Sequence, residues 1–87
     1  MIIKSSKFID DLDFRLHVLK LIEKGIDENV TVSLKDTDKI SSNIITALIS
    51  LDLHCKSKNI ELRIADACER MISGLKQFYP LLKFEEA

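Results

Sequence analysis

The chain predicts an α/β fold in which strands and helices alternate in the order β-α-β-α-β-α around a small, mostly parallel sheet. Segments 30–34 and 60–64 alternate apolar and polar residues with the period of two that half-buried strands show. Three further segments carry apolar residues at helical spacing. Strands joined through helices pair in parallel with right-handed crossovers, so this alternation predicts one layered unit.

Length and composition favour a single globular domain over residues 1–87. The chain is 46% hydrophobic and 31% charged, with 2 glycines and 1 proline, which favours a compact domain over a disordered one. Its net charge is -1 and its lysines are scattered, so nucleic acid is not an expected partner. No apolar run approaches the ~20 residues of a membrane span, and the first residues lack the apolar core of a secretion signal. We therefore expect a cytoplasmic protein without direct membrane insertion.

The N-terminal part predicts a strand followed by a helix. Ile2-Ile3 and Phe8-Ile9 are interpreted as one strand interrupted by polar residues. The carboxylates of residues 10–13 favour a helix N-terminus, and Gly25 is placed to end that helix with a left-handed cap. The residues that we expect to form the core stripe of this helix are Leu12, Leu16, Leu19, Ile22 and Ile26.

The remaining chain repeats this plan twice. A strand over Val30–Leu34 leads through a charged loop at Lys35–Lys39 to a helix from about Ser42 to about Lys56. A strand over Ile60–Ile64 leads to a helix that Asp66 is expected to cap and Pro80 to end. The expected core positions of the two helices are Ile44, Ile45, Leu48, Leu51 and Cys55, and then Cys68, Ile72, Leu75 and Tyr79. The apolar tail at Leu81–Phe84 is interpreted as either a last strand or a docking arm.

One face of the predicted sheet is polar. Thr31 and Ser33 on one strand, and Glu61 and Arg63 on another, put polar groups on the second face. Parallel strands covered on both faces are usually continuous apolar runs. We therefore expect the helices to lie mainly on one face of the sheet and to leave the other face to solvent or to a partner.

The histidines and cysteines do not predict a catalytic set. His17 lies on the polar side of the first helix and His54 near the end of the second, so both are expected to face solvent. Neither is placed near a serine or cysteine nucleophile in the predicted fold. Cys55 and Cys68 lack metal-ligand spacing and are interpreted as buried free thiols on apolar helix faces.

Phosphate-binding and metal-binding patterns are also missing from the sequence. Gly25 and Gly74 are isolated, and no glycine-rich phosphate loop is present. Asp36 and Asp38 offer two carboxylates, whereas a divalent ion prefers about six oxygens. We therefore expect a protein that is not an enzyme and that needs neither a metal nor another cofactor.

The most informative segment joins the second strand to the second helix. It reads Ile40, Ser41, Ser42, Asn43, Ile44 and Ile45, followed by Thr46-Ala47-Leu48. This run, the next strand at Ile60–Ile64 and the following helix together resemble a STAS domain over about residues 8–80. That family includes bacterial anti-sigma factor antagonists, in which an apolar residue, Asp, Ser or Thr, a small residue, Gly and Leu begin the helix. Here Ser41 stands at the aspartate position and Ile44 at the glycine position.

The resemblance implies a non-catalytic interaction module with Ser42 as the residue that a kinase, itself the anti-sigma factor, would phosphorylate. Asp36, Asp38, Ser41 and Asn43 are the expected partner contacts around it. A second reading is an accessory STAS subunit of an ABC-type lipid transporter, bound to the transporter ATPase. A degenerate nucleotide-binding module is disfavoured because the glycines are missing. The serine pair therefore predicts a helix cap, a phosphorylation switch or an unmodified partner contact, and a homodimer remains open.

Overall fold

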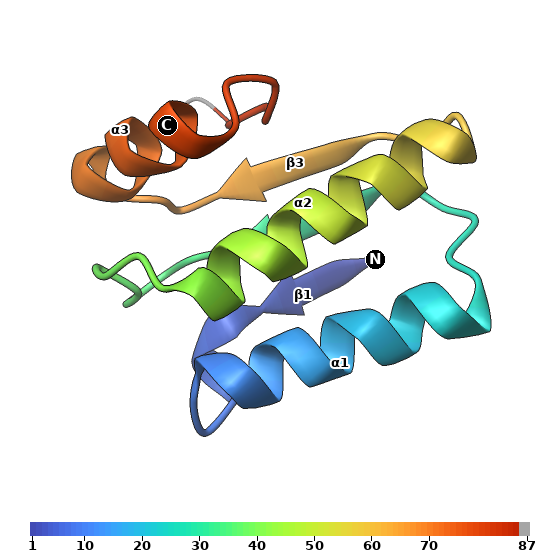
Figure 1. Ribbon diagram of the computed structural model, residues 1–87, viewed down its shortest axis with the longest axis horizontal. Coiled ribbons are helices and arrows are strands. Elements are labelled where there is room, and N and C mark those ends of the chain that lie inside the picture. Colours follow the sequence, from blue (N-terminus) through green and yellow to red (C-terminus); the bar gives the residue numbers. More distant parts are fainter. Residues whose placement is uncertain (86–87) are drawn as a thin grey trace.

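A computed structural model of the chain describes residues 1–85, in which three strands and three α-helices alternate (Figure 1). The strands are β1 (Ile2–Lys4), β2 (Val30–Ser33) and β3 (Leu62–Ala65), and the helices are α1 (Asp11–Lys24), α2 (Ser42–Ser57) and α3 (Glu69–Phe78). This order confirms the predicted β-α-β-α-β-α arrangement. Within residues 1–85, no helix is both long enough and apolar enough to cross a bilayer.

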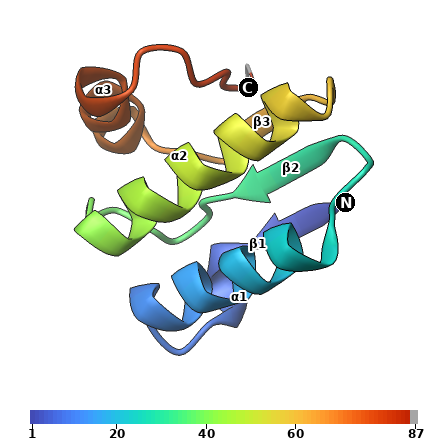
Figure 2. The same ribbon diagram turned by 45° about the vertical axis from the view of Figure 1, so that its right-hand side comes forward.

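The sheet has the strand order β1-β2-β3, and both strand pairs are parallel. Helices α1 and α2 lie over one face of it, whereas α3 lies beside β3 (Figures 1 and 2). Ile3, Val32 and Ile64 are paired across the sheet and are all buried on the helix side. Their neighbours Ile2 and Arg63 are exposed, so the opposite face is open, as the polar residues of β2 and β3 predict.

The first predicted strand is shorter than expected. Strand β1 ends at Lys4, and a short 3-10 helix at Ser5–Lys7 turns the chain toward α1. Phe8 then packs against the core, but Ile9 is 94% exposed and belongs to no strand. The prediction of one interrupted strand reaching Ile9 is therefore wrong, because the 3-10 turn ends the extended backbone.

Helix α1 begins and ends as predicted. Asp10 is its N-cap, and its Oδ1 accepts a hydrogen bond from the backbone N–H of Asp13 at 2.8 Å. Gly25 follows the last helical residue with a φ of +91°, a conformation that glycine adopts at little cost.

The core stripe predicted for α1 is wrong for its first three residues, whereas Ile22 packs against the core and Ile26 is buried as predicted. Leu12 and Leu16 are each 49% exposed and Leu19 is 37% exposed, whereas Phe14 and Val18 are buried. Phe14 is held inward by an edge-on contact with Phe8, whose ring centroid lies 5.6 Å away. The three leucines, here called the outer leucines, therefore form a separate apolar stripe on the solvent side of α1.

The other two helices agree better with prediction. In α2, the expected core residues Ile44, Leu48, Leu51 and Cys55 are buried, and Ile45 is partly buried. In α3, Leu75 alone of the expected core residues is buried, Ile72 and Tyr79 are half-buried, and Met71, which the predicted stripe left out, is also buried.

The start of α3 departs from the sequence-based prediction. Asp66 does not cap this helix: the N-cap is Cys68, which makes no side-chain capping hydrogen bond. Cys68 is exposed, so the prediction of a buried thiol holds only for Cys55. The physical reason is that the helix begins later than expected, which leaves Cys68 outside the buried face.

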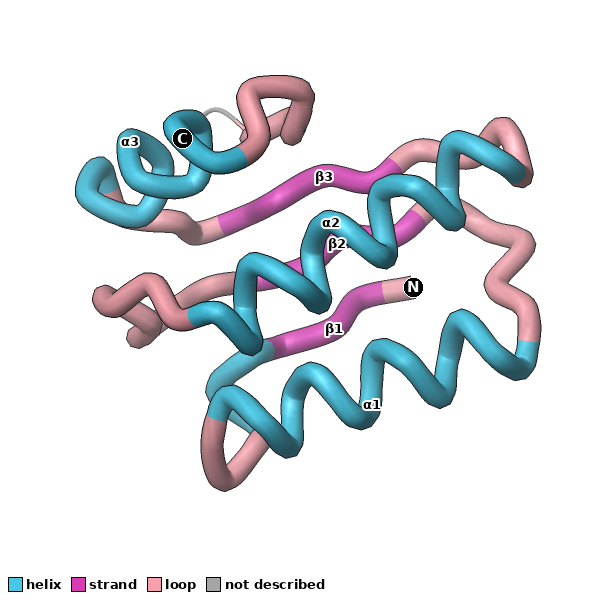
Figure 3. Tube along the Cα trace, viewed as in Figure 1, coloured by secondary structure: helices cyan, strands magenta, loops and turns pink. Residues whose placement is uncertain are grey.

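The C-terminal tail returns to the sheet after α3 (Figure 3). The backbone N–H of Ile64 donates to the Lys83 carbonyl, and the N–H of Glu85 donates to the Ile64 carbonyl, both at 2.8 Å. These bonds form an isolated parallel bridge between Ile64 and Phe84, while Leu82 is buried. The tail therefore pairs with β3 at one position rather than forming a regular strand.

Candidate functional site

The predicted site residues lie where β2 ends and α2 begins, and they are here called the junction surface: Asp36, Asp38, Ser41, Ser42 and Asn43. In a parallel sheet the carboxyl ends of the strands and the N-termini of the following helices meet at one edge, where α/β proteins usually bind their ligands. The serine pair is part of this edge.

Ser41 is the N-cap of α2. Its backbone is extended, with a φ of -125° and a ψ of 161°, and its Oγ accepts a hydrogen bond from the N–H of Ile44 at 3.2 Å. Its carbonyl accepts the first helical hydrogen bond, from Ile45, at 3.1 Å. Ser41 is half-buried. The hydroxyl of Ser41 is therefore already used inside the protein, to satisfy a free backbone donor of the helix.

Ser42 is the first residue of α2 and is exposed. Within residues 1–85 its hydroxyl takes part in no hydrogen bond. The two serines therefore differ in one respect: Ser41 caps the helix, and Ser42 does not.

Asn43 holds the start of α2 against α1. Its Oδ1 accepts a hydrogen bond from Arg15 Nη1 at 3.2 Å, and both residues are half-buried. Arg15 Nε is buried and has no hydrogen-bond partner among the described residues. Asn43 is therefore an internal contact between the helices as well as a candidate partner contact, and Arg15 is a contributor that sequence reasoning did not identify.

The loop before Ser41 presents its two carboxylates to solvent. Asp36 and Asp38 are both exposed, and Asp36 has a φ of +65°, a left-handed conformation that Asp tolerates better than most residues. Thr37 anchors the loop between them: its Oγ1 lies 2.8 Å from Ser5 Oγ, and its N–H donates to the Leu34 carbonyl at 3.0 Å. The loop therefore has a fixed path that displays Asp36 and Asp38 beside the start of α2.

Ile40 fixes the last part of this loop against α3. A side-chain carbon added at Gly74 would collide with Ile40 Cδ1, so the glycine is what permits the close approach. Ile40 is half-buried and packs against the core. The apolar residue before the serine pair is thus an anchor for the junction surface.

A second polar contact at the same edge was not predicted. Ser33, at the end of β2, donates its Oγ hydrogen to Asp66 Oδ2 at 2.6 Å. Ser33 is buried, although its position on the polar side of the strand predicted exposure. Asp66 has a φ of +59°, which marks a local departure from ordinary backbone geometry just after β3. No sequence pattern distinguishes this Asp from an ordinary cap, so its role was missed.

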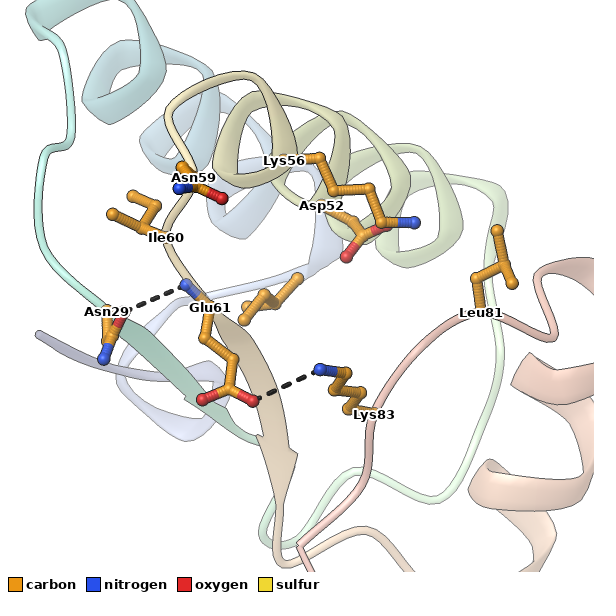
Figure 4. A pocket seen from close by; sticks show the side chains of 9 residues that line it. Asn29, Asp52, Lys56, Asn59, Ile60, Glu61, Leu81 and Lys83 are labelled. Atoms are coloured by element: carbon orange, nitrogen blue, oxygen red, sulfur yellow. Dashed lines mark hydrogen bonds and ion pairs between the residues drawn. The ribbon is translucent and has the colours of Figure 1, made fainter.

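A pocket at the other end of the sheet is lined by residues of both charges (Figure 4). Asp52 Oδ2 accepts a hydrogen bond from the Tyr79 hydroxyl at 2.6 Å and lies 3.0 Å from Lys56 Nζ. Glu61 Oε1 lies 3.4 Å from Lys83 Nζ. Each carboxylate in this pocket is therefore paired. The Asp52 contact joins α2 to the end of α3, and the Glu61 contact joins the start of β3 to the tail.

The titratable groups around this pocket respond to their pairing. The hydrogen bond to Asp52 raises the pKa of the Tyr79 hydroxyl, and a hydrogen bond to the same carboxylate raises the pKa of Lys56. Hydrogen bonds from Arg63 and Lys83 lower the pKa of Glu61. Burial, reinforced by the charge of Asp52, raises the pKa of the Cys55 thiol. Because thiolate is the reactive form, Cys55 is poorly suited to nucleophilic chemistry.

His54 lies far along α2 from the serine pair. His54 Nε2 lies 3.1 Å from the carbonyl oxygen of Ile26, so the prediction that His54 simply faces solvent is wrong. It is twelve residues after Ser42 along one helix, which corresponds to roughly 18 Å. His17 is exposed and its ring centroid lies 4.9 Å from that of Phe8. Within residues 1–85, no group of three or more His, Cys, Asp or Glu side chains is placed to hold a metal ion.

Comparison of the chain with protein-family models, curated proteins and solved structures finds no match.

Proposed function

We propose that this protein is a non-catalytic interaction module, similar to an anti-sigma factor antagonist, that docks its junction surface onto another protein. One observation carries the proposal. Ser41 already caps α2, while the hydroxyl of Ser42 is exposed and makes no hydrogen bond within residues 1–85. A helix N-terminus needs only one such cap, so the second hydroxyl is free for control of binding.

A phosphate on Ser42 would act on the surface rather than on the fold. It would add about -1.5 to -2 charges at a helix N-terminus, where the helix dipole favours anions. Helix α2 would therefore keep its structure. A partner that buries the unmodified hydroxyl against apolar or acidic groups of its own would lose affinity, because the phosphate must be desolvated and is repelled by those acidic groups.

The outer leucines extend the proposed docking surface onto α1. Arg15 lies between Leu12 and Leu16 in sequence, and it reaches Asn43 in the first turn of α2. The stripe therefore starts beside the helix that carries Ser42. Exposed leucines repeated along one helix form an apolar patch of the kind that marks protein interaction sites. The proposed partner is a kinase that is also the anti-sigma factor.

The outer leucines also favour a second candidate function. A stable accessory subunit of an ABC-type lipid transporter would hold its ATPase through a permanent contact. Permanent interfaces are more apolar than transient ones, and three leucines exposed by 37–49% would suit such a contact. In this version Ser42 is a contact that is never modified. Neither version involves nucleic acid or insertion into a membrane, and both fit a cytoplasmic protein.

Native co-purification of the tagged protein, followed by mass spectrometry of the partner and of Ser42, tests the proposal. Recovery of a kinase-like protein together with some phosphorylated Ser42 supports the regulator, and recovery of an ABC ATPase with unmodified Ser42 supports the subunit. The matched variants are Leu16→Asp in the stripe and Gln77→Asp on α3, which add the same single negative charge at exposed positions. Loss of the partner only with Leu16→Asp is expected. Equal recovery with both variants, or recovery of only a homodimer, contradicts docking at this surface.

A further inference from the structure

The two edges of the sheet differ in a way that points to a second binding site. At one edge, residues 83–85 cover β3 through the bridge between Ile64 and Phe84. At the other edge, β1 pairs with β2 alone, and no described segment pairs with its outer side (Figure 1). An uncovered edge strand presents free backbone donors and acceptors to which another strand can add.

The register identifies the free groups on β1. The N–H of Thr31 donates to the Met1 carbonyl at 2.9 Å, and Ile3 is the register partner of Val32. In a parallel ladder, successive residues direct their backbone groups to opposite sides of the strand. Because Met1 and Ile3 face β2, Ile2 directs its N–H and carbonyl outward, and Lys4 directs its N–H outward. These three groups are the template for an added strand.

A groove runs beside this edge. It has a volume of about 410 Å³ and lies between β1 and α1, and its lining includes Ile2, Lys4, Lys7, Phe8, His17 and Leu21. Its size falls within the roughly 300–1,000 Å³ of ordinary ligand pockets. Phe8 is fixed in it by contacts with Phe14 and His17, with ring centroids 5.6 and 4.9 Å away. The groove therefore has an ordered apolar floor beside unpaired backbone.

The charge of the groove specifies its occupant. Lys4 and Lys7 are exposed at its rim, and none of its lining residues is acidic. We propose that an extended acidic peptide segment of a partner protein adds to β1 as a fourth strand. Alternate side chains of an added strand point to opposite faces. Apolar residues would then enter the groove against Phe8 and Leu21, and acidic residues would lie beside Lys4.

The same charges disfavour a second copy of this chain at the edge. Pairing two β1 strands about a two-fold axis would bring Lys4 and Lys7 of both copies to one short strand pair. Like charges across neighbouring strands are destabilising. The site is also separate from the junction surface, since it uses the outer edge of β1 and the side of α1 that carries His17 and Leu21. It therefore goes beyond the proposed function and does not depend on it.

A synthetic peptide of alternating Val and Glu is the probe, and its counterpart with Lys in place of Glu is the charge control. Amide NMR spectra of the protein should show shifts centred on Ile2 and Lys4 when the acidic peptide is added at up to about 1 mM. The Lys peptide should bind more weakly. Ile2→Pro, which removes an outward N–H while sparing the ladder to β2, should also weaken binding.

Charge reversal at the rim is compared with the same change elsewhere. Lys4→Glu combined with Lys7→Glu should lower affinity for the acidic peptide about tenfold. The control, Lys58→Glu combined with Arg70→Glu, makes the same change in net charge at exposed positions away from β1 and should leave affinity within about twofold. Unchanged Ile2 and Lys4 amides, equal binding of both peptides, or equal loss in both double variants would overturn the proposal.

Discussion

Arg15 Nη1 donates a hydrogen bond to Asn43 Oδ1 at 3.2 Å, and this contact joins α1 to the first turn of α2. It connects the outer leucines with the serine pair, which are distant in sequence. Within residues 1–85 the Arg15 guanidinium makes no other hydrogen bond, and its buried Nε has no partner. The docking surface proposed for this protein therefore depends on a contact that the sequence does not reveal.

We predict that Asn43→Ala lowers the free energy of unfolding by about 1–3 kcal/mol, because it leaves a half-buried guanidinium without its acceptor. Urea unfolding measures the change. The double variant Arg15→Met, Asn43→Ala should recover most of the loss, since it removes both polar partners together. An unchanged stability for Asn43→Ala would mean that the contact contributes nothing.

The two serines should differ in stability. Ser41→Ala removes the N-cap acceptor and is expected to lower the unfolding free energy by about 1 kcal/mol. Ser42→Ala changes an exposed hydroxyl and should stay within about 0.5 kcal/mol of wild type. Thermal and urea unfolding of the two single variants provide the test. Equal effects, or a larger effect at Ser42, would contradict the assignment of Ser41 as the cap.

The corrected phase of α1 has a direct stability test. Phe14→Ala is expected to cost about 3–5 kcal/mol, because the buried ring leaves a cavity in the core. Leu16→Ala, two residues later, should cost less than about 1 kcal/mol, because that side chain is 49% exposed. Urea unfolding of both variants compares them. A large loss with Leu16→Ala and a small loss with Phe14→Ala would restore the original prediction of the core stripe.

Tyr79 gives a pH prediction with a defined sign. The hydrogen bond to Asp52 raises its pKa in the folded protein. The bond therefore contributes stability fully below the unfolded pKa of about 10, and this stability is lost as the pH rises through the higher folded value. The single tyrosine and the absence of tryptophan make its ultraviolet absorbance change easy to follow.

In the wild-type protein, the ionisation midpoint of Tyr79 should therefore lie at a higher pH in the folded state than in the urea-unfolded state. Asp52→Asn is the control and should bring the two midpoints closer together. The melting temperature of Tyr79→Phe should fall less steeply above about pH 10 than that of wild type. A folded midpoint at or below the unfolded one would show that the contact with Asp52 does not hold in solution.

Much of the fold follows from sequence periodicity, but helix phase does not always. Two sets of apolar residues in α1 have helical spacing: one contains Leu12, Leu16 and Leu19, and the other contains Phe14 and Val18. The spacing alone therefore permits either face of the helix to be the core face. The choice depends on Phe8, which packs against Phe14 only after the chain has turned. In α2 the predicted core residues are buried or partly buried, although Leu53 of the same helix is exposed.

Site residues were predictable where they belong to a local pattern and were missed where they depend on tertiary contacts. The serine pair marks a helix start in sequence, and the structure assigns its cap to Ser41. The hydrogen bond between Ser33 and Asp66 and that between His54 and Ile26 join residues 33 and 28 positions apart. Such contacts depend on how distant segments are placed against each other in the folded chain. A local sequence pattern carries no information about that placement.

We propose that the exposed hydroxyl of Ser42 controls docking without supporting the fold. The most direct test measures the affinity of the co-purified partner for Ser42→Glu, with Gln77→Glu on α3 as a control of equal charge change. We expect Ser42→Glu to bind at least about tenfold more weakly, and its unfolding free energy to remain within about 1 kcal/mol of wild type. Wild-type affinity for Ser42→Glu, or an equal loss with Gln77→Glu, would contradict the account.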